Sequence, residues 1–417
     1  MNRFIVVGAG PAGLSLALQL ARAGQAVTLI EAAEGHQFSR AFRGDALMPC
    51  GLEALARMGL WPLLEALPHR PLEGWSVWVE RRRLFAVPEP MGSLQPCRLV
   101  PQADLLEALL QEAIRHPSLC WMPSTRVRGL AREGHPHGLG RVRGVDLGDG
   151  RTLEADLVVA CDGRQSQLRQ RAGLPMTCSG QGLELLWFTL PTTAGIGPEQ
   201  PDPAVPGFMT LLAGGAIGSA CRGARGELQL AWLLHQGDTS LRRSHTEWAE
   251  RLAQLAPEPL AQRLRQGTDQ LSEPMRASVQ VGLAPRWCCP GLLLLGDAAH
   301  PMSPVRAQGI NGALRDAAVA ARQLIELAQP LALGATPSPT AIDARLAAIE
   351  AERRPEVSQL QILQAEELRR GELLRQSPAL RCLLAATAPL LGGLIGRRWR
   401  SQQLQLRQGI NRLTVRP

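Results

Sequence analysis

The sequence predicts an α/β protein with three parts: a doubly wound domain built from separated segments, an inserted and mostly antiparallel β-sheet domain, and a helical C-terminal segment. Three observations support this prediction. An apolar strand, a glycine loop and a helical pattern open the chain. Strand-like segments dominate from about 183 to 281, and only helical patterns follow a Pro- and Gly-containing linker at 330–339. The first domain is expected to comprise 1–72, 98–176 and 282–330, the inserted domain 73–97 and 177–281, and the helical segment 331–417.

The first motif is a glycine loop between a strand and a helix. Residues 3–7 form an apolar run that enters the sequence Gly-Ala-Gly-Pro-Ala-Gly, and a helical pattern follows. In such a loop Gly8 permits the tight turn, Gly10 lets the backbone approach a pyrophosphate, and Gly13 lets the helix pack close to the strand. The N-terminus of that helix then faces the phosphates.

An acidic residue completes this motif. The next apolar run, 26–30, reads as a second strand and ends at Glu31, 18 residues after Gly13. In that position a carboxylate can accept hydrogen bonds from both hydroxyls of an adenosine ribose. Strand, loop, helix, strand and acid together predict a Rossmann-like dinucleotide-binding site.

Two later strands each deliver an aspartate. Residues 157–160 lead into Cys-Asp-Gly-Arg, where Asp162 by itself indicates no more than a strand-to-helix turn. The wholly apolar run 292–295 suits a buried parallel strand and is followed by Asp297. Since such sheets bind ligands at the carboxyl ends of their strands, Asp297 can hold a polyol hydroxyl. Gly309 then begins a helix whose backbone N–H groups could face an anionic ring.

The remaining elements follow from hydrophobic periodicity. The C-terminal helical pattern is expected to break at Pro355, Pro378 and Pro389. Within it, residues 382–396 carry no charge, which favours a core-packing helix over an interfacial helix with arginines at the lipid headgroups. The other expected helices are 47–58, 102–115, 244–255 and 309–327, and the other expected strands are 75–80, 83–87, 125–130, 141–147, 183–189, 208–212, 228–234 and 278–281.

Composition excludes several kinds of chemistry. The chain has neither Lys nor Tyr, so no lysine Schiff base, lysine general base or tyrosine phenol can act in it. Six of the eight net positive charges lie in residues 397–417, which leaves no nucleic-acid signature in the rest. The nine Cys form no CxxC pair, so we expect neither a metal site nor disulfides, and a reducing compartment. No signal-peptide pattern precedes the first strand, and we expect a cytoplasmic protein.

Taken together, the three motifs resemble those of the FAD-dependent aromatic-ring hydroxylases, the single-component flavin monooxygenases of the para-hydroxybenzoate hydroxylase type. The resemblance covers about residues 1–325. It implies a Rossmann-like FAD-binding domain with an inserted, mostly antiparallel substrate domain. It also implies noncovalent FAD, electrons from NADH or NADPH, and a C4a-hydroperoxyflavin that oxygenates a small organic substrate with O2. The substrate would be an aromatic, polyketide-like or isoprenoid compound that is hydroxylated or epoxidised.

The resemblance also assigns roles to single residues along the expected cleft. The pyrophosphate would lie on the glycine loop, and the flavin ring near the start of the last helix of the domain. Position by position, Gly8, Gly10, Ala12 and Gly13 would hold the pyrophosphate, Glu31 the ribose, Arg43 and Gln102 the phosphates and ribityl chain, Asp162 the cofactor and the nicotinamide donor, Asp297 the ribityl chain, and Gly309, Ile310 and Asn311 the pyrimidine end of the flavin.

Three residues are candidates for catalysis. Pro304 would lie near the edge of the flavin that reacts with oxygen. Arg306 departs from the family and would place a fixed positive charge beside the flavin, where it could stabilise negative charge or orient an acidic substrate; alternatively it points to solvent. For His300, a structural role as a hydrogen bonder that fixes the loop is favoured, and a role as catalytic acid or base is the less favoured alternative. The family often has glycine where this chain has Ala307 and Ala313.

Two other functions stay open at the level of the sequence. The first is an FAD-dependent reductase or dehydrogenase without oxygenation, as in the related prenyl-chain reductases. The second is a membrane-docked FAD protein that uses its Arg-rich C-terminus, where a weak peripheral contact is possible on charge alone. Trp75 and Trp78 are expected to pack in a sheet rather than to line a pocket. Neither the substrate nor the oligomeric state can be predicted.

Overall fold

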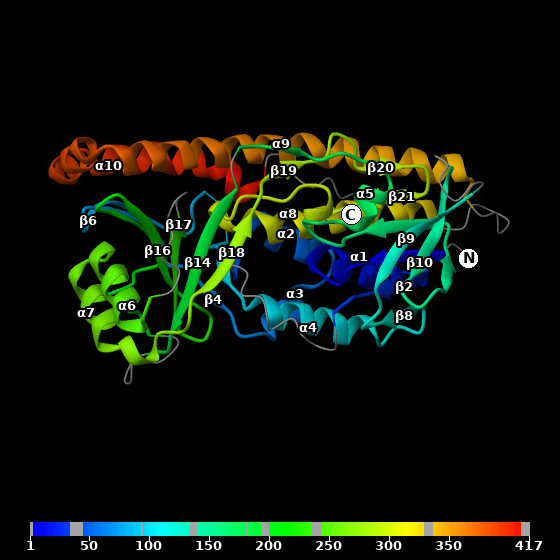
Figure 1. The fold of residues 1–417 in the computed structure, drawn as a ribbon, viewed down its shortest axis with the longest axis horizontal. Coiled ribbons are helices and arrows are strands. Elements are labelled where there is room, and N and C mark those ends of the chain that lie inside the picture. The colour runs from blue at the N-terminus through cyan, green and yellow to red at the C-terminus, as the bar shows by residue number, and fades with distance from the viewer. Residues whose placement is uncertain are drawn as a thin grey trace.

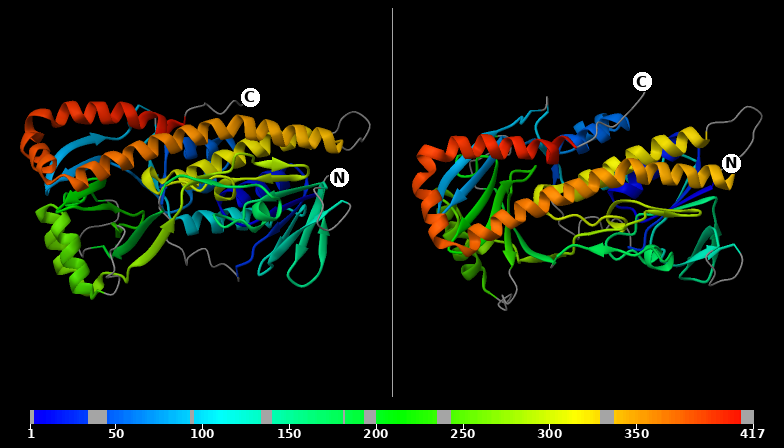
Figure 2. Two further views of the ribbon diagram at one scale, coloured as in Figure 1. Left: turned by 45° about the horizontal axis from the view of Figure 1, so that its top comes forward. Right: turned by 90° about the horizontal axis from the view of Figure 1, so that it is seen from above.

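The computed structural model describes residues 3–33, 45–92, 95–133, 140–180, 182–192, 200–234, 243–328 and 337–409. The molecule is elongated, with one large sheet towards each end (Figure 1). Two long helices, α9 (Pro339–Gln376) and α10 (Pro378–Gln408), lie along one side, and α9 passes over both sheets (Figure 1). Because α10 folds back beside α9, the pair forms a helical hairpin (Figure 2). A helical C-terminal segment is therefore confirmed.

The first sheet has six strands in the order β20-β21-β12-β1-β2-β8, and all neighbours are parallel except β20 with β21. The apolar runs of the glycine-loop motif form its centre, because strands buried on both faces read as continuous apolar segments. The strands predicted at 3–7, 26–30 and 157–160 have the predicted boundaries, and the strand predicted at 292–295 ends one residue earlier. The strands are β1 (Arg3–Val7), β2 (Ala26–Ile30), β8 (Leu119–Met122), β12 (Leu157–Ala160), β20 (Cys288–Cys289) and β21 (Leu292–Leu294).

Helices cover one face of this sheet and a small sheet covers the other. The helices α1 (Pro11–Arg22), α4 (Gln102–Ala113) and α8 (Gln308–Ala328) share one hydrophobic core with the sheet. On the opposite face a second core joins it to the three-stranded sheet β9 (Val127–Arg132), β10 (Val142–Leu147) and β11 (Thr152–Glu154). This layering confirms the α/β class of the first part of the chain.

The second large sheet has seven strands in the order β18-β14-β17-β16-β15-β5-β6. All neighbouring strands are antiparallel except β15 and β5. The helices α6 (His245–Leu255) and α7 (Glu258–Gln266) cover one face, and Ser244 caps α6. Because side chains alternate along a strand, the other face is free to line a cavity. The strands are β5 (Gly74–Val79), β6 (Arg82–Pro88), β14 (Leu183–Leu190), β15 (Phe208–Ala213), β16 (Ala216–Arg222), β17 (Leu228–Leu234) and β18 (Met275–Val279).

Short elements connect the two sheets. They include a three-stranded sheet in the order β3-β7-β4 and a pair formed by β13 and β19. Their bounds are β3 (Ala46–Leu47), β4 (Arg70–Pro71), β7 (Arg98–Leu99), β13 (Thr177–Cys178), β19 (Gly282–Leu283), α2 (Pro49–Arg57), α3 (Trp61–Glu65), α5 (Gln167–Arg171), and the 3₁₀ turns η2 (Thr268–Gln270), η3 (Gly296–Ala298) and η4 (Val305–Ala307).

Two of the predicted helix breaks are wrong. A helix does end before Pro378, but Pro355 lies inside α9 and Pro389 inside α10. Proline removes one backbone hydrogen bond and crowds the preceding turn, yet packing on both sides can hold such a helix together. Next to Pro355, the buried Arg353 and Glu356 make ion pairs that anchor α9 on both sides.

The prediction of a core-packing helix at 382–396 holds for one face only, where Leu384, Ala388 and Ile395 pack in the hydrophobic core formed with β5 and β6. On that face the small residues Gly392 and Gly396 approach strand β6, while on the other face five leucines are exposed. A Cβ at Gly392 would lie 2.1 Å from the carbonyl oxygen of Leu84, so the helix approaches the strand as closely as glycine allows. By length and composition, α10 could span a membrane, and 22% of its most apolar window is buried.

Candidate functional site

The site is a continuous cleft at the carboxyl ends of the parallel strands. A cavity of about 720 Å³ lies over the glycine loop. A second cavity of about 220 Å³ extends from there to the seven-stranded sheet. The two cavities share four lining residues: Gly10, Gln102, Cys161 and Gly163.

The glycine loop borders both cavities. Gly8 has a φ of 102°, and a Cβ there would lie 2.3 Å from the carbonyl oxygen of Cys161. A Cβ on Gly13 would lie 1.9 Å from the carbonyl oxygen of Gly8. In contrast, a Cβ on Gly10 would meet no atom within 4 Å, because this residue faces the cleft. The outer two glycines therefore serve backbone packing, and the middle one leaves room for a ligand.

Glu31 lies in the larger cavity at the end of β2. The backbone N–H groups of Ala9 and Ala33 donate hydrogen bonds of 2.7 and 2.9 Å to its two carboxylate oxygens. These bonds fix the carboxylate, and each oxygen keeps a second lone pair for a ligand hydroxyl. The geometry suits the role of ribose acceptor that the resemblance implies.

The second and third motifs meet through an ion pair. Arg164 Nε donates to Asp297 Oδ2 at 3.3 Å, and Arg164 Nη1 donates to the Ser278 carbonyl at 2.8 Å. Asp297 and Arg164 both line the smaller cavity. Asp162 lines the larger one and accepts from Leu168 N at 3.1 Å through Oδ2, while its buried Oδ1 has no partner within the described part of the chain. An unpaired buried acceptor that faces a cavity is suited to a ligand donor.

His300 is buried away from the cleft. It is 1% exposed, and it is absent from the described lining of both cavities. Its Nε2 lies 2.6 Å from Asp316 Oδ2, which also accepts from Gly296 N at 3.0 Å. Burial opposes ionisation of Asp316, but the nearby His300 and Arg353 outweigh it and lower its pKa to about 2. A catalytic role for His300 therefore has no geometric support, because the imidazole braces the loop after β21 instead.

The start of α8 forms the floor of the smaller cavity. Pro304, Gly309 and Ile310 line it, as does Ala12 from α1. Asn311 does not line it and braces the floor instead. Its amide accepts from Met48 N at 2.8 Å and donates to the carbonyl oxygens of Ala46 and Ala307 at 3.1 and 2.7 Å. Gln102 lines both cavities, and Arg43 lies outside the described residues.

Arg306 does not point to solvent. Its side chain is 7% exposed, lines the smaller cavity and forms an ion pair with Glu367 of α9. Its guanidinium carbon lies 4.9 Å from the ring centroids of both Trp75 and Trp399. Arg306 and Ala307 have φ angles of 59° and 49°, a left-handed conformation that costs a residue other than glycine about 1 kcal/mol. This conformation explains why the family often has glycine at the position of Ala307.

Arg306→Met should destabilise the fold, because it leaves the Glu367 carboxylate without its cation. Breaking a fully buried pair costs about 3–5 kcal/mol. Glu367 is 22% exposed and also accepts from Gln403 Nε2 at 3.0 Å, so we expect about 2 kcal/mol. Denaturant unfolding of the apoprotein measures this loss.

The double variant Arg306→Met/Glu367→Gln is the control for this prediction. It removes both charges together and should recover most of the lost stability. Equal stability of the single variant and the parent would show that the ion pair does not hold the loop. Because Glu367 neutralises much of the field of Arg306, we expect the double variant to change substrate KM less than the single one.

Sequence reasoning missed the polar group at the far side of the smaller cavity. Asp45 is 7% exposed, accepts from Gln229 Nε2 at 2.6 Å and from Gln102 N at 3.3 Å, and lines this cavity. Burial raises the pKa of Asp45 to about 6, although these two hydrogen bonds lower it. The available signal was the position of Asp45 two residues after Arg43, which the resemblance places at the cofactor.

Aromatic side chains form the wall of the smaller cavity. Trp75, Trp187 and Phe208 line it, and the rings of Trp75 and Phe208 are 4.9 Å apart. The expectation that Trp75 only packs in the sheet is therefore wrong, since its ring does both. Trp78 instead packs against the core beneath α6 and α7, as expected.

The cleft fits a dinucleotide that carries a flat ring. Helix α1 has no side-chain cap and no acidic residue in its first turn, so its N–H groups are free for a pyrophosphate. Glu31 in one cavity and Asp297 in the other can accept hydroxyls on either side of it. The apolar second cavity then has room for a ring next to Gly309 and Ile310.

Comparison with known proteins decides the family. A sequence profile described as "FAD binding domain" matches residues 2–361. The chain belongs to the FAD-dependent aromatic-ring hydroxylases. 6-Methylpretetramide 4-monooxygenase from Streptomyces rimosus is 34% identical over 377 residues, which cover 86% of this chain and 82% of that protein. Ubiquinone hydroxylase UbiL from Rhodospirillum rubrum is 30% identical over 371 residues, with 84% and 77% covered.

Solved structures share the fold of this chain. PqsL from P. aeruginosa in complex with 2-aminobenzoylacetate has a TM-score of 0.73 at 21% identity, covering 92% of this chain and 98% of that chain. HpxO from Klebsiella pneumoniae, complexed with FAD and uric acid, has a TM-score of 0.71 at 21% identity, covering 98% and 97%. Together with the family match and the relatives above, this makes the chain an FAD-dependent oxidoreductase with FAD as its cofactor, which confirms the predicted family and enzyme class.

Proposed function

We propose that the protein is a monooxygenase that uses NADH or NADPH and O2 to hydroxylate a small hydroxylated aromatic or polyketide-like compound. The observation that carries this proposal is the smaller cavity, where three aromatic rings and the Asp45 carboxyl face the floor formed by Pro304 and Gly309. In support, relatives are named for the oxygenation of 6-methylpretetramide and protoasukamycin. In this proposal the seven-stranded sheet, within 73–97 and 177–281, binds the substrate.

FAD would lie along the cleft, held by residues of this chain. Gly10 and the N-terminus of α1 would hold the pyrophosphate, Glu31 the ribose, and Asp297 the ribityl chain. When bound, FAD supplies the transfer of electrons from NADH or NADPH to O2 and of an oxygen atom to the substrate. The protein itself would bind the substrate against the ring, exclude water and accept a proton from the substrate.

Asp45 is the group best placed to take a proton from a substrate hydroxyl. With a pKa of about 6 it is largely ionised at neutral pH. Burial raises the pKa of both thiols in this cavity, Cys161 and Cys221, so these stay protonated. The arginines cannot accept a proton, and Asp297 is paired with Arg164. The titratable residues among the described lining of this cavity are Asp45, Cys161, Arg164, Cys221, Asp297 and Arg306.

Isotope labelling with O2 tests the proposed reaction. The purified protein should be yellow and release FAD on denaturation. With a hydroxyaromatic or polyketide-like substrate, NAD(P)H oxidation should accelerate, and the product should gain one oxygen atom that comes from ¹⁸O2. Turnover of substrate under strict anaerobiosis would instead establish the reductase alternative. Colourless protein that cannot be reconstituted with FAD would overturn both functions.

A further inference from the structure

Helix α10 carries its large apolar side chains on the outside. Leu383, Leu390 and Leu394 are 59, 86 and 63% exposed, and Leu380 and Leu391 are exposed as well. At 3.6 residues per turn these positions fall within an arc of roughly 100° on one side of the helix. A helix of a soluble domain normally turns such a stripe toward the core. These five residues are called the leucine face: Leu380, Leu383, Leu390, Leu391 and Leu394.

The opposite side of α10 is already occupied by the protein. Gly392 and Gly396 approach β6, where a Cβ on Gly396 would lie 3.2 Å from Phe85. Towards each end of the helix an arginine is tied to the sheet, with Arg381 bound to Glu80 at 2.5 Å and Arg407 paired with Glu89. The helix is therefore anchored along its length, and the leucine face cannot turn inward.

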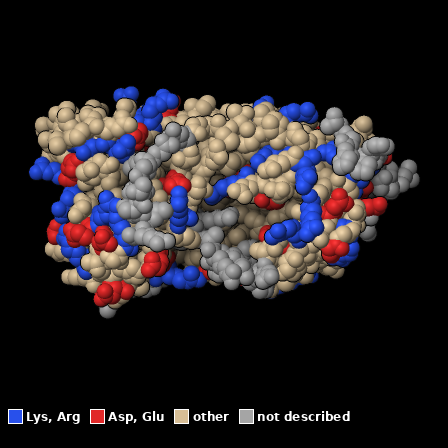
Figure 3. Space-filling model, viewed as in Figure 1, with Lys and Arg blue, Asp and Glu red and all other residues tan. Residues whose placement is uncertain are grey.

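Exposed arginines lie beside the leucine face. Arg397, Arg398 and Arg400 follow it on α10, which contains no acidic residue. Within the described residues, no salt bridge to an acidic side chain is found for these three arginines, called the arginine cluster. The surface around the turn between α9 and α10 is mostly uncharged, with arginines along its edge (Figure 3).

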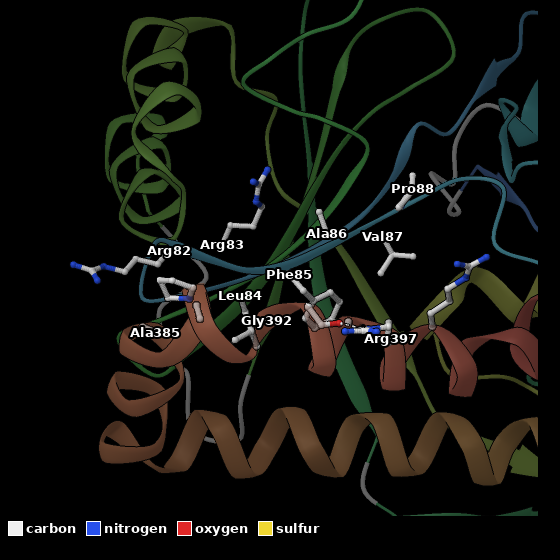
Figure 4. A pocket seen from close by; sticks show the side chains of 15 residues that line it. Arg82, Arg83, Leu84, Phe85, Ala86, Val87, Pro88, Ala385, Gly392 and Arg397 are labelled. Atoms are coloured by element: carbon white, nitrogen blue, oxygen red, sulfur yellow. Dashed lines mark hydrogen bonds between the residues drawn. The ribbon is translucent and has the colours of Figure 1, made fainter.

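A groove of about 510 Å³ adds to this surface. It lies between β6 and α10, and its walls are largely apolar. Arg82 and Arg83 extend away from the helix at one end of the groove, and Arg397 lies against α10 toward the other (Figure 4). Positive charge thus borders an apolar surface at both ends, which is the pattern of a segment that lies at a membrane interface.

We infer that α10 docks the protein on the surface of a bilayer that contains anionic phospholipids. The helix lies parallel to the membrane, with the leucine face at the boundary between headgroups and acyl chains and the arginine cluster at the phosphates. A spanning orientation would require α10 to leave β6 and would bury Arg381 in lipid. A second copy of the chain is a poorer partner, because its α10 offers no acidic side chain to the arginine cluster.

The structure also locates the docking charges more narrowly than composition did. Of the six arginines in 397–417, Arg407 is buried in its pair with Glu89 and is unavailable to lipid. A deletion from 397 onward would remove this pair and the contact of Trp399 with Arg306, so it would damage the fold. Substitutions on the exposed face of α10 test docking without this damage.

Vesicle cosedimentation of the FAD-loaded protein tests the inference. The parent protein should bind phosphatidylcholine vesicles that contain phosphatidylglycerol and bind pure phosphatidylcholine poorly. Leu390→Ser/Leu394→Ser should lower the partition coefficient about tenfold or more, since the apolar contact is lost. Arg397→Gln/Arg398→Gln/Arg400→Gln should lower it about a hundredfold on anionic vesicles only, as should high salt on the parent.

A matched variant controls for non-specific effects. Ile114→Ser/Arg115→Gln makes one apolar-to-serine and one arginine-to-glutamine change at the end of α4, where both side chains are exposed, and should bind like the parent. FAD content and unfolding should be unchanged in all variants. Equal binding of the parent and the leucine variant to vesicles would overturn the inference. A parent protein that does not cosediment with anionic vesicles would overturn it as well. A parent dimer that the leucine variant converts to monomers would assign the leucine face to a second copy instead.

Discussion

Gly10→Val should give a folded protein that no longer retains FAD. Gly10 has φ of −77° and ψ of −177°, a conformation open to valine, and a Cβ there meets no protein atom within 4 Å. The new side chain would instead fill the space above the N-terminus of α1, where the pyrophosphate is expected to lie. We expect FAD affinity to fall at least about a hundredfold, because the phosphates lose their close contact with backbone N–H groups.

The measurement is FAD retention after gel filtration, followed by titration of the apoprotein with FAD. Unfolding of the apoprotein should resemble that of the parent apoprotein. Gly13→Ala is the contrasting variant, since its Cβ would lie 1.9 Å from the Gly8 carbonyl oxygen and should destabilise the apoprotein itself. If Gly10→Val binds FAD like the parent, the pyrophosphate lies elsewhere and the assignment of the cleft is wrong.

The parts of the site that sequence could predict are those encoded by local patterns. The strands 3–7, 26–30 and 157–160 were predicted with their boundaries, because each is a mainly apolar run that ends in a glycine or acidic turn. The glycine loop belongs to the same class, since its three glycines act within six residues of each other. Local spacing carries this information without knowledge of the rest of the chain.

Contacts between distant segments could not be predicted. The hydrogen bond between Asp45 and Gln229 joins residues 184 positions apart, and that between Arg164 and Asp297 joins residues 133 apart. Neither pair leaves a periodic signal, so the raised pKa of Asp45 appears only once the fold brings it into the cavity. The exposed leucines of α10 were misjudged for a related reason, because apolar composition alone does not tell which side of a helix meets the sheet.

Arg306 shows how such distant contacts change an interpretation. From sequence, it was expected either as a fixed cation beside the flavin or as a side chain that points to solvent. In the structure Glu367 pairs with it, and the rings of Trp75 and Trp399 both contact its guanidinium group. The loop under the expected flavin is therefore held by both C-terminal helices, and Gln308 Nε2 adds a 2.7 Å bond to the Leu406 carbonyl. The two C-terminal helices thus hold the loop at 306–308 in place as well as packing along one side of the molecule.

Asp45→Asn should make the protein more stable and less active at neutral pH. The folded-state pKa of Asp45, about 6, lies above the ordinary value of 3.8. The folded state therefore binds its proton more tightly, and the parent loses stability as pH rises from about 4 to 6. This shift corresponds to about 3 kcal/mol above pH 6, which the uncharged Asn does not lose. Denaturant unfolding at pH 4 and pH 7 measures the difference, which should be present only at the higher pH.

Activity should change in the opposite direction. If the Asp45 carboxylate takes the proton of a substrate hydroxyl, the rate in the parent should rise with pH through about 6, because only the ionised form can act. In Asp45→Asn this rise of the rate with pH should disappear, and kcat should fall about 10²-fold to 10⁴-fold, with FAD binding intact. Gln229→Leu removes the 2.6 Å hydrogen bond that stabilises the carboxylate, so the rise of the rate should move to higher pH without abolishing turnover. An unchanged pH profile in Asp45→Asn would show that Asp45 takes no part in the proton transfer. A gain in stability together with lost activity would instead show that Asp45 lowers the stability of the fold at neutral pH and is needed for the reaction.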